Sequence, residues 1–151
     1  GAMSIMYGRL SREKVSISWP DGLASCFVRG DIVRIEQVMV NLIDNAMQAM
    51  ESLDEKRIDI TLVSRSRMQV LLIRDYGPGI PEDELVRVFE PFYTTKKAGQ
   101  GLGLGLSISY RIVDSLGGDL SVSNHPQGGA IFELSLPTDP HQGIDQQLTS
   151  I

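Results

Sequence analysis

A single acid follows a short apolar run in the middle of the chain and precedes two glycines at alternate positions. Residues 70–73 read Val-Leu-Leu-Ile, a pattern typical of a buried strand. Asp75 stands where this strand should end, and Gly77 and Gly79 allow a sharp turn or the close approach of another group. A buried carboxylate needs a partner, and the exocyclic amine of a purine is one such partner. The alternative is an ordinary Pro-Gly turn with a capping acid.

A second group of polar side chains lies on a segment with the period of a helix. Asn41, Asn45 and Gln48 follow one another at steps of four and three residues, so they share one helix face. Asparagine is a poor helix former, and oxygen ligands suit Mg²⁺, which keeps phosphate oxygens and waters as its other ligands. The pattern therefore predicts a magnesium site, and the alternative is a solvent-exposed polar face. Asp31 is the expected N-cap, and the apolar stripe consists of Ile35, Met39, Leu42, Ala46 and Met50.

Four glycines at alternate positions, from Gly99 to Gly105, lead into another amphipathic segment. We expect a helix from Leu104 to a C-cap at Gly117-Gly118. A glycine-rich loop before a helix N-terminus offers free N–H groups and a positive dipole end to an anion. The glycine spacing differs from that of P-loops, Rossmann loops and protein-kinase loops. The alternative is a flexible linker.

Several further elements must position these groups. Pro81 and the acids after it predict a helix start. The stretch 90–103 has no clear period and is expected to be a long, mobile loop that acts as a lid. Residues 1–14 carry no clear period either. The predicted strands are residues 15–19 and 25–28, which could pair, residues 58–63 and 68–73, joined by a hairpin loop over 64–67, and residues 119–123 and 130–136.

The composition limits the class of protein. The chain of 151 residues is 42% hydrophobic and 22% charged, which suits one globular domain. A net charge of −5 argues against a non-specific nucleic-acid binder. Cys26 is the only cysteine, which fits a reducing compartment, and no apolar run approaches the roughly 18 residues of a membrane span. We interpret residues 1–3 as an expression scar, 4–137 as the domain and 138–151 as a flexible C-terminal tail.

The order of four motifs resembles the catalytic ATP-binding domain of bacterial sensor histidine kinases. This domain belongs to a superfamily that includes gyrase, the large heat-shock chaperone and MutL. The resemblance covers roughly residues 15–137. It implies a two-layer α/β sandwich (the Bergerat fold), with a mixed, mainly antiparallel five-stranded sheet, three helices on one face and a mobile ATP lid. The motifs are Asn41-x-x-x-Asn45-Ala46, Asp75-x-Gly77-x-Gly79, Phe89-Glu90-Pro91-Phe92 and Gly99-x-Gly101-x-Gly103-x-Gly105.

The resemblance also implies a role for each matching position. Asp75 would bind the adenine amino group, and Asn45 would be the Mg²⁺ ligand, with Asn41 one turn earlier near the metal and phosphates. Phe89 and Phe92 would anchor the lid. The cofactor-binding residues implied for ATP and Mg²⁺ are Asn41, Asn45, Gln48, Asp75, Gly77, Gly79, Ile80, Phe89, Phe92, Thr95, Lys96, Gly99, Gln100, Gly101, Leu102, Gly103, Leu104, Gly105 and Ala130.

Three departures from the family pattern stand out. Many members carry lysine where Gln48 stands, so this amide or Lys96 from the lid would have to meet a phosphate. Many carry threonine where this chain has Ala130. No phosphoacceptor histidine on a dimerisation helix is visible, because His125 and His141 lie in a turn and a polar tail and are expected at the surface.

Hydrolytic members of the superfamily carry a glutamate where this chain has Asn41. An amide cannot accept a proton at neutral pH, so Asn41 and Lys96 would position and neutralise phosphate rather than activate water. We expect a kinase that phosphorylates a histidine on a separate dimerisation domain of its parent and acts upstream of a response regulator, with C4-dicarboxylate sensors as the favoured type. The alternatives are a regulatory nucleotide-binding module and an anti-sigma-type serine kinase. The fragment is expected to be cytoplasmic and monomeric, without nucleic acid or direct membrane contact, although its parent would be an inner-membrane sensor.

Overall fold

The computed structural model describes residues 2–21, 31–91, 93 and 105–138. They form four helices and five strands in this part of the chain. The helices are α1 (Ala2–Arg12), α2 (Ile32–Ala49), α3 (Glu82–Leu85) and α4 (Gly105–Ser115), and the strands are β1 (Val15–Ser18), β2 (Lys56–Arg65), β3 (Met68–Asp75), β4 (Asp119–Asn124) and β5 (Ala130–Pro137).

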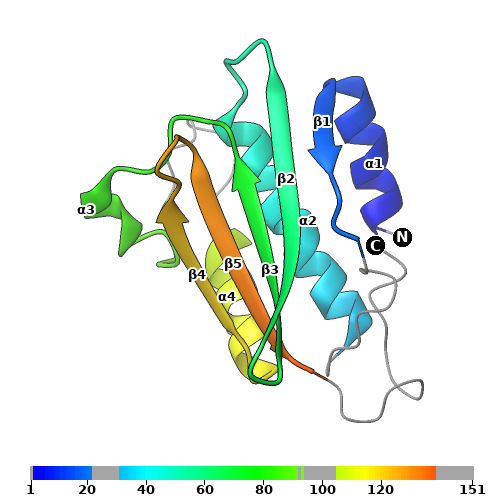
Figure 1. Ribbon diagram of the computed structural model, residues 1–151, viewed down its shortest axis with the longest axis vertical. Coiled ribbons are helices and arrows are strands. Elements are labelled where there is room, and N and C mark those ends of the chain that lie inside the picture. Colours follow the sequence, from blue (N-terminus) through cyan, green and yellow to red (C-terminus); the bar gives the residue numbers. More distant parts are fainter. Residues whose placement is uncertain (1, 22–30, 92, 94–104, 139–151) are drawn as a thin grey trace.

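The five strands form one sheet in the order β1-β2-β3-β5-β4. β1 pairs with β2 in parallel, and the other three pairs are antiparallel. Figure 1 shows α2 and α4 behind the sheet, with α1 beside β1 and α2. Side chains of all three longer helices join one core with the sheet, so the predicted mixed, two-layer fold is confirmed.

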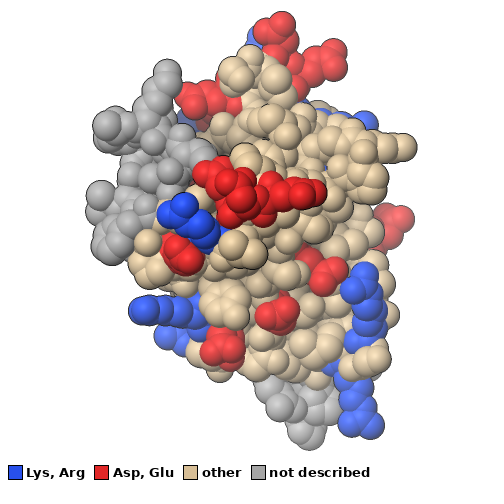
Figure 2. All heavy atoms as spheres, turned by 90° about the vertical axis from the view of Figure 1, so that its left-hand side faces the viewer, with Lys and Arg blue, Asp and Glu red and all other residues tan. Residues whose placement is uncertain are grey.

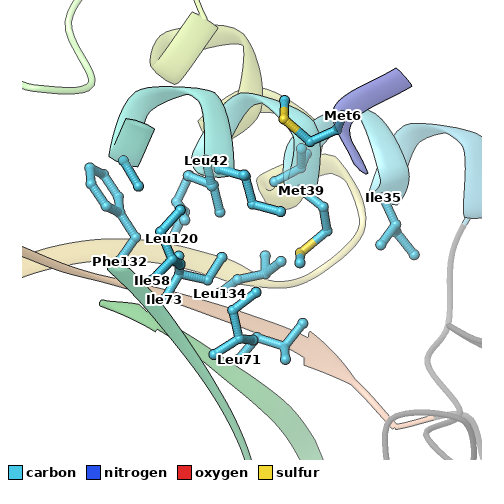
Figure 3. Close-up of a cluster of buried hydrophobic side chains, with 14 of the residues drawn as sticks. Met6, Ile35, Met39, Leu42, Ile58, Leu71, Ile73, Leu120, Phe132 and Leu134 are labelled. Carbon is cyan, nitrogen blue, oxygen red and sulfur yellow. The ribbon is translucent and has the colours of Figure 1, made fainter. Parts of the chain in front are cut away.

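Helix α2 forms the centre of the core because its apolar residues recur with helical period. The side chain of Asp31 accepts a hydrogen bond from the Val33 amide at 2.9 Å, so the predicted N-cap is confirmed. Figure 3 shows the α2 side chains facing those of the strands. The buried residues of α2 are Ile35, Val38, Met39, Leu42, Ile43, Ala46 and Met47, and they meet strand residues such as Ile58, Ile73, Phe132 and Leu134.

Two sequence-based predictions about the elements are corrected. Residues 1–14, which show no clear period, contain α1, whose Met6 and Leu10 are buried in the shared core. The strand predicted at 15–19 pairs with β2 in parallel, and its predicted partner, residues 25–28, lies outside the described part of the chain. The hairpin loop over 64–67 is a two-residue turn, because Ser66 and Arg67 adopt φ values of 44° and 67° and pairing continues to either side.

The helix that is predicted to start at Pro81 is short. Helix α3 ends at Leu85, and turns follow up to residue 91. Within α3 no residue is buried, and Val86 directly after it is 83% exposed. The apolar residues that contact the rest of the protein, Val88 and Phe89, lie in the turns that follow the helix.

Candidate nucleotide site

Asp75 is the last residue of β3, and its side chain is buried with 2% exposure. Its Oδ1 accepts a hydrogen bond from the Gly77 amide at 2.8 Å and another from the Ala130 amide at 3.3 Å. The first donor belongs to the turn after β3, and the second to the start of β5. The carboxylate therefore links the turn after β3 to the start of β5, at the end of the sheet where the sequence predicts the purine.

Burial raises the pKa of Asp75 above its ordinary value. The amides of Gly77 and Ala130 and the charge of Arg74 act in the opposite direction. Within the described chain, both hydrogen bonds to this carboxylate end on Oδ1. A buried acid of this kind gains from any further donor, so it suits recognition of an amino group.

The backbone approaches the carboxylate closely on both sides. A Cβ atom at Gly129, where φ is +85°, would lie 1.9 Å from the carbonyl oxygen of Asp75. Only glycine fits such a contact without movement of the backbone. A Cβ atom at Gly77 would lie 3.1 Å from Asp75 Oδ1 and 2.9 Å from the carbonyl oxygen of Ala49 at the end of α2. The turn after β3, the end of α2 and the β4–β5 turn therefore meet around Asp75.

The predicted amide face of α2 meets the start of α4. The half-buried Asn41 donates from Nδ2 to Ser109 Oγ at 3.1 Å and lies 3.5 Å from the carbonyl oxygen of Gly105. Gly105 is the first residue of α4 and the last glycine of the glycine-rich segment. Asn45, also half-buried, follows one turn later on the same helix. The predicted ligand Asn41 and the first turn of α4, a favourable place for an anion, are thus neighbours.

Gln48 has a different environment from the other two amides. Its Nε2 donates to Asp44 Oδ2 at 2.8 Å, and Arg9 Nη1 of α1 donates to Asp44 Oδ1 at 2.6 Å. Arg9 and Gln48 also line a cavity of about 260 Å³, together with Glu13, Met47 and Glu51. The amide that replaces the lysine of many relatives is therefore engaged with the neighbouring acid, and its contact with a phosphate stays a prediction.

Phe89 supports the predicted role of an aromatic anchor. Its ring centroid lies 5.3 Å from that of Tyr110 on α4 and 6.3 Å from that of Phe132 on β5. The chain segment after α3 is thereby fixed to the core. Among the other predicted site residues, Ala130 donates its amide to Asp75, and Ile80 pairs with Asn124. The other predicted lid and loop residues lie outside the described part of the chain: Phe92, Thr95, Lys96, Gly99, Gln100, Gly101, Leu102, Gly103 and Leu104.

Tyr76 and Asn124 fix the turn after β3, and the sequence pattern predicts neither role. The ring of Tyr76 lies 4.1 Å from the guanidinium carbon of Arg74, and its hydroxyl donates to Asp59 Oδ2 at 2.5 Å. Asn124, at the end of β4, forms two hydrogen bonds with Ile80. An asparagine before a turn is so common that its type alone carries no functional signal.

Acidic side chains mark the side of the molecule that carries α3 (Figure 2). Figure 2 shows acidic side chains gathered on the side of the molecule that carries α3, whose first turn holds Glu82, Asp83 and Glu84. Because like charges repel, this side disfavours an anionic ligand. Among the described residues, no cluster of three His, Cys, Asp or Glu side chains could hold a metal ion. None of the described helices is long and apolar enough to cross a membrane.

Comparisons with known sequences point to one family. A family model described as "Histidine kinase-, DNA gyrase B-, and HSP90-like ATPase" matches residues 30–140. The C4-dicarboxylate transport sensor protein DctB of Pseudomonas aeruginosa is 39% identical over 114 residues, which are 75% of this chain and 19% of DctB. Sporulation kinase A of Bacillus subtilis is 37% identical over 113 residues, 75% of this chain and 18% of that protein. The chain thus spans less than a fifth of the length of these relatives.

Solved structures agree with the sequence comparisons. The catalytic domain of the histidine kinase ThkA matches with a TM-score of 0.72 and 29% identity, over 93% of this chain and 90% of that one. Full-length ShkA in complex with AMPPNP matches with a TM-score of 0.72 and 26% identity, over 91% of this chain and 28% of that one. The similarity extends over nearly the whole chain in both comparisons.

Proposed function

Because the chain belongs to the family of histidine kinase-, DNA gyrase B- and HSP90-like ATPases, we propose that it binds Mg-ATP and donates the γ-phosphate to a histidine. The acceptor would lie on a separate dimerisation domain of the parent protein. One observation carries the proposal: a buried acid at the end of β3 lies at one end of α2, and Asn41 on the same helix lies against the start of α4, with Asn45 one turn later.

Each part of the site suits one part of the nucleotide. Asp75 accepts a hydrogen bond from the adenine amino group, since burial makes a further donor favourable. The first turn of α4 offers N–H groups and the positive end of the helix dipole to the phosphates. Asn45, with Asn41 beside it, supplies oxygen ligands to Mg²⁺. When bound, Mg²⁺ neutralises negative charge on the phosphates.

The same residues explain why phosphotransfer is favoured over hydrolysis. Asn41 donates to Ser109 and carries no group that could take a proton from water at neutral pH. Catalysis by this domain is then positioning and electrostatic stabilisation of the phosphoryl group. The nucleophile comes from the dimerisation domain, and Lys96 is the further cation that we propose for the transferred phosphate.

The parent protein is proposed to be a sensor kinase that acts on a response regulator. Its relatives include the two-component sensor PprA of Pseudomonas aeruginosa, 35% identical over 91% of this chain and 15% of that protein. The identities to DctB and to sporulation kinase A differ by only two percentage points. A C4-dicarboxylate signal therefore remains one proposal among several sensor types.

Calorimetric titration with Mg-ATP tests the binding site. Wild-type protein should bind, and Asp75→Asn should bind at least tenfold more weakly, because an amide oxygen is a weaker acceptor than a carboxylate and an amide NH₂ opposes the adenine amine. Equal affinities would refute the assignment of the purine to Asp75.

A second function is a regulatory module that binds nucleotide without transferring phosphate. The pairing of Gln48 with Asp44 favours it, since the lysine of many relatives is replaced by an amide already in use. Incubation with labelled ATP and the parent's phosphoacceptor helices separates the two functions. Acid-labile label on histidine supports the kinase, acid-stable label indicates a serine kinase of the anti-sigma type, and no label supports the regulatory module.

A further inference from the structure

The side chain of Asn124 connects the two turns that surround Asp75. Its Nδ2 donates to the carbonyl oxygen of Ile80 at 2.6 Å, and its Oδ1 accepts from the amide of Ile80 at 2.8 Å. The amide side chain therefore pairs with one backbone unit in both directions, as a neighbouring strand would. Residues 80 and 124 are 44 positions apart, so this contact fixes a loop that local sequence does not.

The backbone of Asn124 pairs in the sheet with the residue that donates a hydrogen bond to the Asp75 carboxylate. Asn124 is the last residue of β4 and pairs with Ala130, the first residue of β5. Ala130 donates its amide to Asp75 Oδ1. One rung of the sheet therefore contacts Asp75 through Ala130 and the following loop through Asn124.

Gly79 provides independent support for the importance of this contact. It has φ of +80°, and a Cβ atom there would lie 2.9 Å from Asn124 Oδ1. A larger residue at this position would push the loop away from Asn124. Gly79, which the family resemblance places among the ATP-binding residues, thus also makes room for the Asn124 side chain.

We propose that Asn124 is a positioning residue for the base-binding end of the site. It acts through Ile80 and Gly79, which it holds at a fixed place relative to Asp75. This inference rests on the proposed nucleotide function and adds to it a residue that has no counterpart in the four motifs. Because Asn124 acts at the base end, its loss weakens the binding of AMP, ADP and ATP by a similar factor. The dependence of ATP affinity on Mg²⁺ stays unchanged.

Calorimetry with AMP, ADP and Mg-ATP tests this assignment on Asn124→Ala and Asn124→Asp. We expect a loss of about tenfold in affinity for all three nucleotides, because two hydrogen bonds to Ile80 disappear in the alanine variant. Asn124→Asp keeps the acceptor for the Ile80 amide but sets a carboxylate against the Ile80 carbonyl, so it should bind no better than the alanine variant. The neighbouring exposed Ser123→Ala is the control and should match the wild type.

The readouts separate this inference from the function on which it rests. If Asn124→Ala binds AMP, ADP and ATP as tightly as the wild type does, the role of Asn124 is refuted and the proposed function stands. A loss confined to ATP would also overturn it, because the effect would then lie at the phosphates. Absence of binding by the wild type would overturn the proposed function together with it. Amide hydrogen exchange without nucleotide adds a second measurement: the Ile80 amide should exchange at least tenfold faster in Asn124→Ala, and unchanged exchange would contradict the role of the side chain.

Discussion

The amide of Ala130 lies 3.3 Å from Asp75 Oδ1, across 55 positions of sequence. The acid that we assign to the purine is therefore held by the strand β5 as well as by its own turn. This arrangement explains how a carboxylate with 2% exposure keeps a defined orientation without a ligand. The donors come from the backbone, so they remain when the side chains around the site change.

Replacing Asp75 with asparagine should stabilise the nucleotide-free protein at neutral pH while it weakens binding. The amide oxygen still accepts from Gly77 and Ala130, and the cost of the buried charge disappears. Burial raises the pKa of Asp75 above its ordinary value of 3.8, so the folded chain holds this proton more tightly than the unfolded chain. The raised pKa of Asp75 therefore contributes stability to the folded wild type that is complete below pH 3.8. This contribution is lost as the pH rises through the higher pKa of the folded state.

Urea unfolding of both proteins between pH 4 and pH 8 measures this effect. The free energy of unfolding of Asp75→Asn, relative to the wild type, should rise with pH and then level off above the folded-state pKa. A difference that falls with pH would show that the two amides outweigh burial and that the pKa of Asp75 is lowered.

Two adjacent glycines in the β4–β5 turn give a matched pair of variants. In Gly128→Ala the new Cβ atom has no other atom within 4 Å, and φ at this position is +107°. This variant therefore suffers only backbone strain of about 1–3 kcal/mol. Gly129→Ala, at φ of +85°, also places its Cβ 1.9 Å from the carbonyl oxygen of Asp75. We expect it to lower the free energy of unfolding by about 1–3 kcal/mol more than Gly128→Ala, because the backbone must move.

Denaturant unfolding and nucleotide titration of both glycine variants check this expectation. Gly129→Ala should also lose affinity for ADP, because a displaced Asp75 no longer meets the base, while Gly128→Ala should retain it. Similar stability and affinity of the two variants would mean that the turn relaxes without moving Asp75.

Asn45→Ala should weaken ATP binding only when Mg²⁺ is present. The amide oxygen is the proposed metal ligand, so its loss should reduce the affinity for Mg-ATP about tenfold. In excess chelator the variant and the wild type should bind ATP alike. Gln37→Ala, at an exposed position of the same helix, is the control. A loss that persists in chelator would place Asn45 against the nucleotide rather than the metal.

Local signals in the sequence were enough to predict the central elements. The cap at Asp31 and the apolar period located α2, and an apolar run followed by Asp75 located the end of β3. These features depend on neighbours within a few residues. For the same reason the amide face of α2 could be predicted, since residues three and four apart share a helix face.

Contacts between distant residues could not be predicted in this way. Helix α1 has no acidic residue in its first turn, and it is held by core packing of Met6 and Leu10 and by the pair of Arg9 with Asp44, 35 positions away. The pairing of Asn124 with Ile80 likewise depends on tertiary structure: β3 and β4 are both antiparallel to β5, so the two strands end at the same edge of the sheet. Both arise from tertiary structure, and neither leaves a periodic pattern in the sequence.

The engagement of Gln48 with Asp44 leads to a prediction about the lysine that many relatives carry. In Gln48→Lys the new ammonium group lies beside Asp44, which already binds Arg9, and hydrogen bonding to Asp44 raises the pKa of Arg9. Asp44 and Arg9 are 27% and 34% exposed. An ion pair between the new lysine and Asp44, which would compete with a contact to phosphate, is therefore worth only about 0.2–1 kcal/mol. The lysine should therefore contact a phosphate in only a fraction of the molecules and Asp44 in the rest. We expect the affinity for Mg-ATP to rise less than twofold in Gln48→Lys and a further two- to fivefold when Asp44→Asn is added.

Titrations of the two single variants and the double variant decide this point, with AMP as the nucleotide that lacks the β- and γ-phosphates. Asp44→Asn alone is the control for the loss of the ion pair with Arg9, and it should leave affinity for Mg-ATP unchanged while it lowers stability slightly. If the lysine reaches the β- or γ-phosphate, the gain in the double variant should be absent for AMP. Equal affinity of Gln48→Lys and the double variant for Mg-ATP would show that Asp44 does not compete for the lysine. A higher affinity of the double variant for AMP would show that the lysine contacts the α-phosphate or the sugar instead.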